Sequence, residues 1–230
     1  MPLDANAALT LALQYSSGTS EDQAQIVANA DDIINAAERA TADHDWHAAL
    51  ALATTIMIDS AALLWCPHSA QGVRLGYIGI AAARALADDT ALAALLHNTA
   101  VALWAQGELA EALQRLKASL AIKERLGDKI GIASTLQALG SMAEDSGEGA
   151  EARQWYTACL TTQQHIGDVT GIVHTLSKLG RIARNAGDPA QARRCIRSGS
   201  NAQGAIGRRA RNGVLFISDG RTRPGTRRSN

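Results

Sequence analysis

The sequence predicts an all-α fold, a solenoid of antiparallel helix hairpins, and three observations lead to it. The first is a phrase that returns every 40 residues: Leu126-Gly127-Asp128, Ile166-Gly167-Asp168 and Ile206-Gly207-Arg208, with a weaker copy at Leu86-Ala87-Asp88. The second is a set of small residues in phase with that phrase: Ala100, Gly140 and Gly180; Gly107, Gly147 and Gly187; Ala112, Ala152 and Ala192. The third is a composition with 3% aromatic residues and only four prolines, which favours closely packed helices over sheets. A fixed period of this length is typical of arrays in which each unit packs on its neighbours.

The first 87 residues are predicted to form a short helix and then degenerate helical repeats. Residues 1–20 hold a helix over 2–15 and a loop, and residues 21–87 hold the degenerate repeats. A long helix is predicted over 21–42, because its apolar positions step by three and four residues. Further helices are predicted over 46–65 and 70–87, separated by a turn at Cys66-Pro67-His68.

From residue 88 the period sets the boundaries of three repeats, 88–127, 128–167 and 168–206. Each repeat is predicted to hold two helices: 89–105 with 108–125, 129–145 with 148–165, and 169–185 with 188–203. Gly107, Gly147 and Gly187 fall where each pair turns. The pattern decays after Ser198, and residues 207–230 form a basic segment that we expect to be disordered. Because no capping helix follows, we expect the array to be incomplete.

Charge and cysteine content exclude several classes of protein. Basic and acidic side chains balance at 22 each, so the overall charge indicates neither a membrane surface nor a nucleic acid. The charge is concentrated at one end, where ten arginines from Arg193 onward face one acid, Asp219. Three widely spaced cysteines indicate a reducing compartment. No secretion signal or membrane-spanning run is present in the sequence, and we expect a cytoplasmic protein that requires no membrane.

The 40-residue unit resembles the tetratricopeptide repeat. The match consists of a large apolar residue, Leu-Gly, a turn glycine, an alanine and a second large residue. It is carried by Leu136, Leu139-Gly140, Gly147, Ala152 and Tyr156, and again by Leu176, Leu179-Gly180, Gly187, Ala192 and Ile196. The unit is similar to the longer repeats of kinesin light chains and to the C-terminal sensor arrays of bacterial nucleotide-switch regulators. The resemblance implies a right-handed superhelix that binds a protein or peptide along a concave groove lined by the first helix of each repeat.

Matching the repeats by position predicts the residues of that groove. The first repeat contributes Ala94, His97, Asn98, Val101, Trp104 and Ala105; the second contributes Ser134, Gln137, Ser141, Glu144 and Asp145; the third contributes His174, Ser177, Arg181, Arg184 and Asn185. The predicted groove therefore changes from apolar to acidic to basic. Trp104 either anchors a ligand or packs against the next repeat, and Arg181 and Arg184 either bind a ligand or are surface charges.

The sequence predicts no catalytic site, no metal site and no cofactor. His44, His47, Cys66 and His68 match no ordinary zinc spacing. The function expected is a protein- or peptide-binding module, as the interaction part of a bacterial regulatory protein. Two alternatives stay open: a stand-alone adaptor, and a nucleic-acid-binding regulator that uses the arginine-rich segment.

Overall fold

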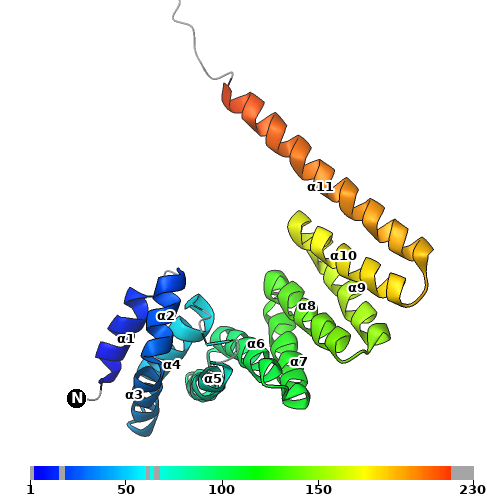
Figure 1. Cartoon of the computed structure of the whole chain (residues 1–230). Helices are drawn as coiled ribbons and strands as arrows, with labels where there is room; N and C mark the ends of the chain where they lie inside the picture. The colour runs from blue at the N-terminus through cyan, green and yellow to red at the C-terminus, as the bar shows by residue number, and fades with distance from the viewer. Residues whose placement is uncertain (1–2, 16–18, 61–62, 65–67, 219–230) are drawn as a thin grey trace, which may run out of the picture. The chain divides into compact units, whose positions relative to one another are not determined.

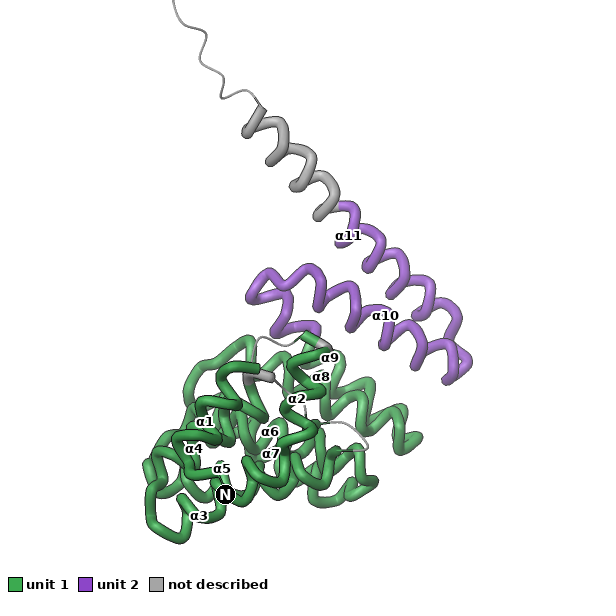
Figure 2. The backbone as a smooth tube through the Cα atoms, turned by 60° about the vertical axis from the view of Figure 1, so that its left-hand side comes forward, with its two compact units in different colours: residues 1–159 green, residues 160–230 purple. Residues whose placement is uncertain are grey.

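The computed structural model describes residues 3–15, 19–60, 63–64 and 68–218, and these residues form helices and the turns between them. Two compact units divide the chain, residues 1–159 and residues 160–230 (Figure 2). Within the first unit α3, α4, α5, α6, α7 and α8 each pack on the next helix, and within the second unit α10 packs on α11 (Figure 1). The prediction of an all-α solenoid of helix hairpins is confirmed. Within the described residues no helix has both the length and the apolar character needed to span a membrane.

The N-terminal part of the first unit contains α1 (Ala5–Gln14), α2 (Ser20–Ala28), α3 (Ala30–Ala42), α4 (Trp46–Thr54), the π-helix η1 (Thr55–Ser60) and α5 (Ser69–Ala85). The prediction of a single helix over 21–42 is therefore wrong, because the helix is interrupted at Asn29. The Asn29 amide Nδ2 donates to the Gln25 carbonyl at 2.8 Å, which competes with regular helix continuation. Residues 66 and 67 of the predicted turn at Cys66-Pro67-His68 lie outside the described residues.

The helix predicted over 46–65 also differs from the structure. After α4 the chain continues as η1 rather than as an α-helix. The Thr54 hydroxyl donates to the carbonyls of Leu50 and Ala51 at 2.9 and 3.1 Å, a pattern that perturbs helices at β-branched residues.

The repeat region contains α6 (Asp89–Ala105), α7 (Leu109–Leu126), α8 (Lys129–Asp145), α9 (Gly149–Ile166), α10 (Val169–Asn185) and α11 (Pro189–Ser218). The bounds of α6, α8 and α10 are those that the 40-residue period predicts. Helix α11 runs beyond the predicted end at 203, so residues 207–218 are helical where disorder was expected. No proline interrupts α11 after Pro189, and arginine has a high helix propensity. The remainder of the expected tail, 219–230, lies outside the described residues.

The recurring Leu-Gly-Asp phrase ends one helix and starts the next. Gly127 has φ +70°, the left-handed conformation that closes α7 without a steric penalty. The next residue, Asp128, accepts a hydrogen bond from the Gly131 backbone N–H at 2.9 Å and so caps α8. Gly167 and Asp168 repeat this geometry, with φ +71° and a 2.9 Å cap. The same helix end and helix start therefore recur every 40 residues.

Buried hydrogen bonds also recur at this period. The Ser119 hydroxyl donates to the Ala93 carbonyl at 2.7 Å, and the in-phase Cys159 thiol donates to the Ala133 carbonyl at 3.3 Å. These bonds fix the second helix of a hairpin against the first.

Candidate partner-binding site

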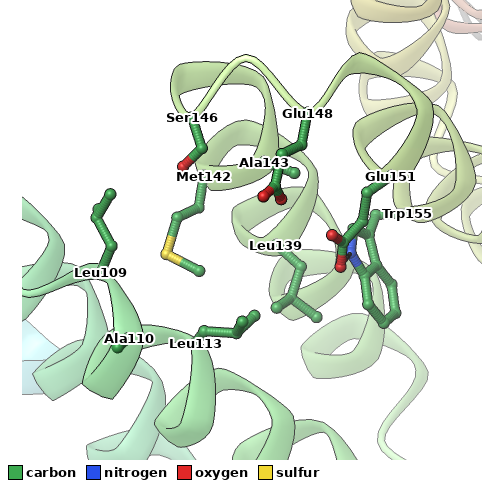
Figure 3. Close-up of a pocket in the computed structure, with 10 residues that line it drawn as sticks. All are labelled: Leu109, Ala110, Leu113, Leu139, Met142, Ala143, Ser146, Glu148, Glu151 and Trp155. Carbon is green, nitrogen blue, oxygen red and sulfur yellow. Dashed lines mark hydrogen bonds between the residues drawn. The ribbon is translucent and has the colours of Figure 1, made fainter.

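A pocket of about 250 Å³ lies between α7 and the α8–α9 hairpin, entirely within the first unit (Figure 3). Three elements line it: Leu109, Ala110 and Leu113 from α7; Leu139, Met142 and Ala143 from α8; and Ser146, Glu148, Glu151 and Trp155 from the turn and α9. A cavity of ~150 Å³ with apolar walls already holds a ring the size of benzene. This pocket therefore has room for one large apolar side chain.

The floor of the pocket belongs to the core of the repeats. Leu139 and Met142 are 1% and 4% exposed, and both pack in the cluster that joins α6 to α9. Leu109, at the start of α7, is by contrast 38% exposed. Figure 3 shows the Leu109 and Met142 side chains on facing sides of the cavity. The pocket therefore has a buried apolar floor and opens to the surface along α7.

Carboxylates form one side of the opening. Glu151 accepts a hydrogen bond from the indole Nε1–H of Trp155 at 3.1 Å, one helical turn along α9. Glu148 is exposed at the turn, and within the described part of the chain it has no ion-pair partner. Figure 3 shows both carboxylates on the Trp155 side of the cavity. The site thus combines an apolar pocket with two negative charges and an indole ring.

The repeat pattern explains why the pocket occurs at this hairpin. At the positions in phase with Leu109 and Leu113, the following repeat has Gly149 and Arg153. At the position in phase with Trp155, the preceding repeat has Arg115. The sequence interpretation missed the pocket because it considered only first-helix residues. These departures from the repeat pattern are the signal that identifies it.

Three of the predicted groove residues of the first repeat have partners inside the first unit. The Asn98 Nδ2 donates to the Met57 carbonyl of η1 at 2.6 Å, and Val101 is 8% exposed. The His97 Nδ1 lies 3.2 Å from the Thr135 hydroxyl of α8. Burial, and then the positive charge of Lys123, lowers the pKa of His97 to about 3. His97 is therefore neutral near pH 7, and its contribution to ligand binding stays a prediction.

Trp104 and the predicted residues of α8 lie nearer the surface. Trp104 is half-buried and packs against the α6–α9 core. Gln137, Ser141 and Glu144 are half-buried, and Asp145 is exposed. The Tyr156 hydroxyl lies 2.9 Å from the Ser141 hydroxyl and donates to Glu144 at 3.3 Å. Ser141 and Glu144 thus position a buried tyrosine, and Ser134 and Asp145 are the exposed members of the predicted α8 set.

The predicted residues of the third repeat belong to α10 in the second unit. All five are exposed: His174, Ser177, Arg181, Arg184 and Asn185. The Ser177 hydroxyl donates to the Val173 carbonyl at 2.9 Å. These residues form a basic exposed face on α10, and its role in binding stays a prediction.

Comparisons with known proteins identify the repeat and the fold. The model of the tetratricopeptide repeat matches residues 92–126, which lie in α6 and α7. No curated protein matches the chain. The structure of BtubC (BKLC) from P. vanneervenii is similar, with a TM-score of 0.62 and 14% identity, and the match covers 99% of this chain and 95% of that one.

Two structures of a kinesin light chain with nearly identical TPR-like repeats, from Podosopora anserina, are also similar. The first, of a variant form, has a TM-score of 0.64 and 15% identity and covers 88% of this chain and 96% of that one. The second has a TM-score of 0.63 and 14% identity, with 87% and 95% coverage. Residues 92–126 thus match the tetratricopeptide repeat, and the chain shares the fold of these repeat structures.

Proposed function

We propose that this tetratricopeptide-repeat chain binds a protein partner and that the pocket between α7 and the α8–α9 hairpin anchors it. Repeats of this family generally act as protein-interaction scaffolds, and interfaces gain most of their energy from a few large side chains seated in pockets. The observation that carries the proposal is the open apolar cavity of about 250 Å³ beside Trp155. Three of its lining residues, Leu109, Leu113 and Trp155, depart from the repeat pattern.

The test is selection of peptides followed by competition with a blocked pocket. Twelve-residue peptides are selected from a random displayed library on the full chain, and their affinities are measured for the Leu113→Arg variant. Leu113 lines the pocket, so the longer charged side chain obstructs it. We expect affinity to fall by about tenfold or more.

The matched control is Ala121→Arg, which adds the same charge at an exposed position of the same helix. It leaves affinity unchanged if the pocket is the anchor. Selected peptides that bind Leu113→Arg as tightly as the unaltered chain would contradict the proposal. Unchanged circular dichroism of both variants establishes that the fold is retained.

The predicted groove supplies a second contact in this proposal. The exposed basic face of α10 suits an acidic stretch of the partner, and Trp104 offers an aromatic surface on α6. Trp104→Ala combined with Arg181→Glu is expected to weaken capture of the selected partner while helical circular dichroism is retained. Unchanged capture by this double variant would remove the groove from the proposal and leave the pocket in place.

The finer role we propose is that of the interaction array of a cytoplasmic bacterial regulatory protein. The resemblance of the 40-residue unit to sensor arrays of nucleotide-switch regulators supports it. The arginines that follow Arg193 favour a second candidate, a regulator that holds nucleic acid through phosphates. Deletion of 207–230 separates the two, because retention on DNA at low salt falls only if those arginines contact phosphates.

A further inference from the structure

Resting on the proposed function, we propose that the pocket selects a peptide in which an arginine lies about one helical turn from a large apolar residue. The apolar side chain occupies the cavity, and the guanidinium binds Glu151 and Glu148 against the ring of Trp155. The sequence interpretation assigned the acidic part of the surface to Glu144 and Asp145. The structure places two further carboxylates directly beside an apolar cavity.

Charge is the first argument. The segment 144–151 contains Glu144, Asp145, Glu148 and Glu151 and no lysine or arginine. The nearest base along α9 is Arg153, which is two positions from Glu151 and so points about 200° away around the helix axis. On the facing helix, Arg115 is already paired with Glu111 at 2.6 Å. The exposed Lys117 of the same helix does not line the pocket, and within the described residues it has no ion-pair partner. The rim of the pocket therefore favours a cation from outside.

The same chain contains an internal example of the recognition we infer. One repeat earlier, Arg115 donates to Glu111, and its guanidinium carbon lies 4.8 Å from the centre of the Tyr77 ring. The Tyr77 hydroxyl donates to the same carboxylate at 2.8 Å. An acid, an aromatic ring and a guanidinium thus form one closed cluster at the surface.

In the next repeat the three positions are occupied differently. Glu151 is in phase with Glu111, Trp155 with Arg115, and Lys117 with Tyr77. Within the described residues Lys117 forms no ion pair, and it does not line the pocket. The carboxylate and the ring are both present, and Glu151 accepts from a neutral indole N–H instead of from a guanidinium. A partner arginine completes the arrangement.

The cavity next to this pair supplies the second requirement. Its apolar floor of Leu139 and Met142 has room for a leucine or aromatic side chain beside the carboxylates. Arginine is favoured over lysine, because a planar guanidinium both stacks on the indole and binds a carboxylate through two N–H groups. A peptide with either feature alone fills half of the site.

The test uses synthetic 12-residue peptides of alanine and glutamine that carry one leucine and, four residues later, one arginine. Three controls replace that arginine with lysine or glutamate, or the leucine with alanine. Titration into the ¹⁵N-labelled full chain is followed at the indole Nε1–H signal of Trp155, identified with Trp155→Phe. We expect saturable shifts for the leucine–arginine peptide, about threefold weaker binding with lysine, and at least about tenfold weaker binding with glutamate or without leucine.

In the double variant Glu148→Gln with Glu151→Gln, the affinity for the leucine–arginine peptide is expected to fall by about tenfold or more. The matched control is Glu124→Gln, an exposed acid at the far end of α7, which leaves affinity unchanged. Equal affinity for the glutamate peptide, retained affinity of the double variant, or absence of any shift at Trp155 would each overturn the inference. If one of these outcomes is found but library-selected peptides still lose affinity for Leu113→Arg, the proposed function stands and only the preference for arginine is wrong.

Discussion

The hairpin α8–α9 and the hairpin α10–α11 share one repeat pattern and differ in how their second helix faces the first. Tyr156 of α9 is fully buried, whereas the in-phase Ile196 of α11 is 64% exposed. In the first hairpin a Cβ atom on Gly140 would lie 2.8 Å from the Tyr156 ring. In the second, a Cβ atom on Gly180 would lie 3.4 Å from the Cβ of Cys195.

The difference amounts to a shift of one residue, about 100° around the helix. In α11 Cys195, which is 4% exposed, takes the place that Tyr156 holds in α9. A cysteine is small enough to leave Gly180 in ordinary contact, whereas the tyrosine ring requires a glycine opposite it. An identical period in the sequence therefore fixes the helix ends but not the rotation of each helix about its axis.

The largest expected difference in the free energy of unfolding is between alanine substitutions at Tyr156 and Ile196, the two large residues at in-phase positions. Tyr156→Ala removes a fully buried ring and is expected to lower the free energy of unfolding by about 3–5 kcal/mol. Ile196→Ala is expected to change it by less than about 0.5 kcal/mol, because the side chain is mostly exposed. Urea unfolding followed by circular dichroism measures both. Comparable losses would show that α11 rotates to bury Ile196.

The second-largest expected difference in the free energy of unfolding concerns buried hydrogen bonds at in-phase positions of consecutive repeats. The buried Lys123 Nζ donates to the Thr135 hydroxyl at 3.0 Å, and at the in-phase positions the Thr175 hydroxyl donates to Gln163 Oε1 at 2.8 Å. Thr135→Val withdraws an acceptor from a buried charge and is expected to cost about 2–3 kcal/mol. Thr175→Val withdraws a donor from a neutral amide and is expected to cost about 1 kcal/mol. Urea unfolding of both variants decides the order, and an equal cost would contradict the role assigned to the Lys123 charge.

Alanine substitutions at Gly140 and Gly180 are expected to change stability by smaller amounts and in opposite directions. Gly140→Ala forces a methyl group against the Tyr156 ring, and the strain of about 1–3 kcal/mol outweighs a gain in helix propensity of about 1 kcal/mol. Gly180→Ala meets only ordinary contacts, so the propensity gain is expected to stabilise the chain by up to about 1 kcal/mol. Thermal unfolding midpoints that move in opposite directions support the comparison. A rise for both variants would mean that the Tyr156 ring yields easily.

The sequence predicts the helix ends of the repeats because those ends depend on local chemistry. A residue with positive φ followed by an aspartate cap requires no knowledge of distant residues. Gly127 and Gly167 precede the caps of α8 and α10, and Ala87, with φ +53°, precedes the cap of α6. The N-terminal region is less predictable, because Asn29 and Thr54 act through hydrogen bonds that compete with the helix. Helical periodicity alone does not reveal such competition.

The candidate site is only partly predictable for a similar reason. Position matching locates the first-helix residues, but it does not say that Asn98 holds η1 or that His97 contacts α8. The pocket at Trp155 depends on how residues of three consecutive helices, α7, α8 and α9, come together in space. Its composition is visible in the sequence only as departures from the repeat at 109, 113 and 155.

The smallest expected effect concerns His97, which contacts the Thr135 hydroxyl; the in-phase position of the next repeat is Gln137, which does not titrate. The folded chain holds the pKa of His97 at about 3, mainly through burial, whereas an unfolded histidine has a pKa of about 6.5. Between these values the unfolded state binds a proton that the folded state does not. Stability is therefore fully present above pH ~6.5 and declines as pH falls toward 3.

At pH 5.5 this linkage is expected to lower the free energy of unfolding by about 1 kcal/mol relative to pH 7.5. His97→Gln places a neutral amide there, as in the next repeat, and is expected to remove most of that difference. His47→Gln, at an exposed position of α4, is the matched control and retains it. Urea unfolding at both pH values measures the three proteins. An unchanged pH dependence in His97→Gln would mean that His97 is hydrated in the folded chain, and would restore it as a charged contact for a ligand.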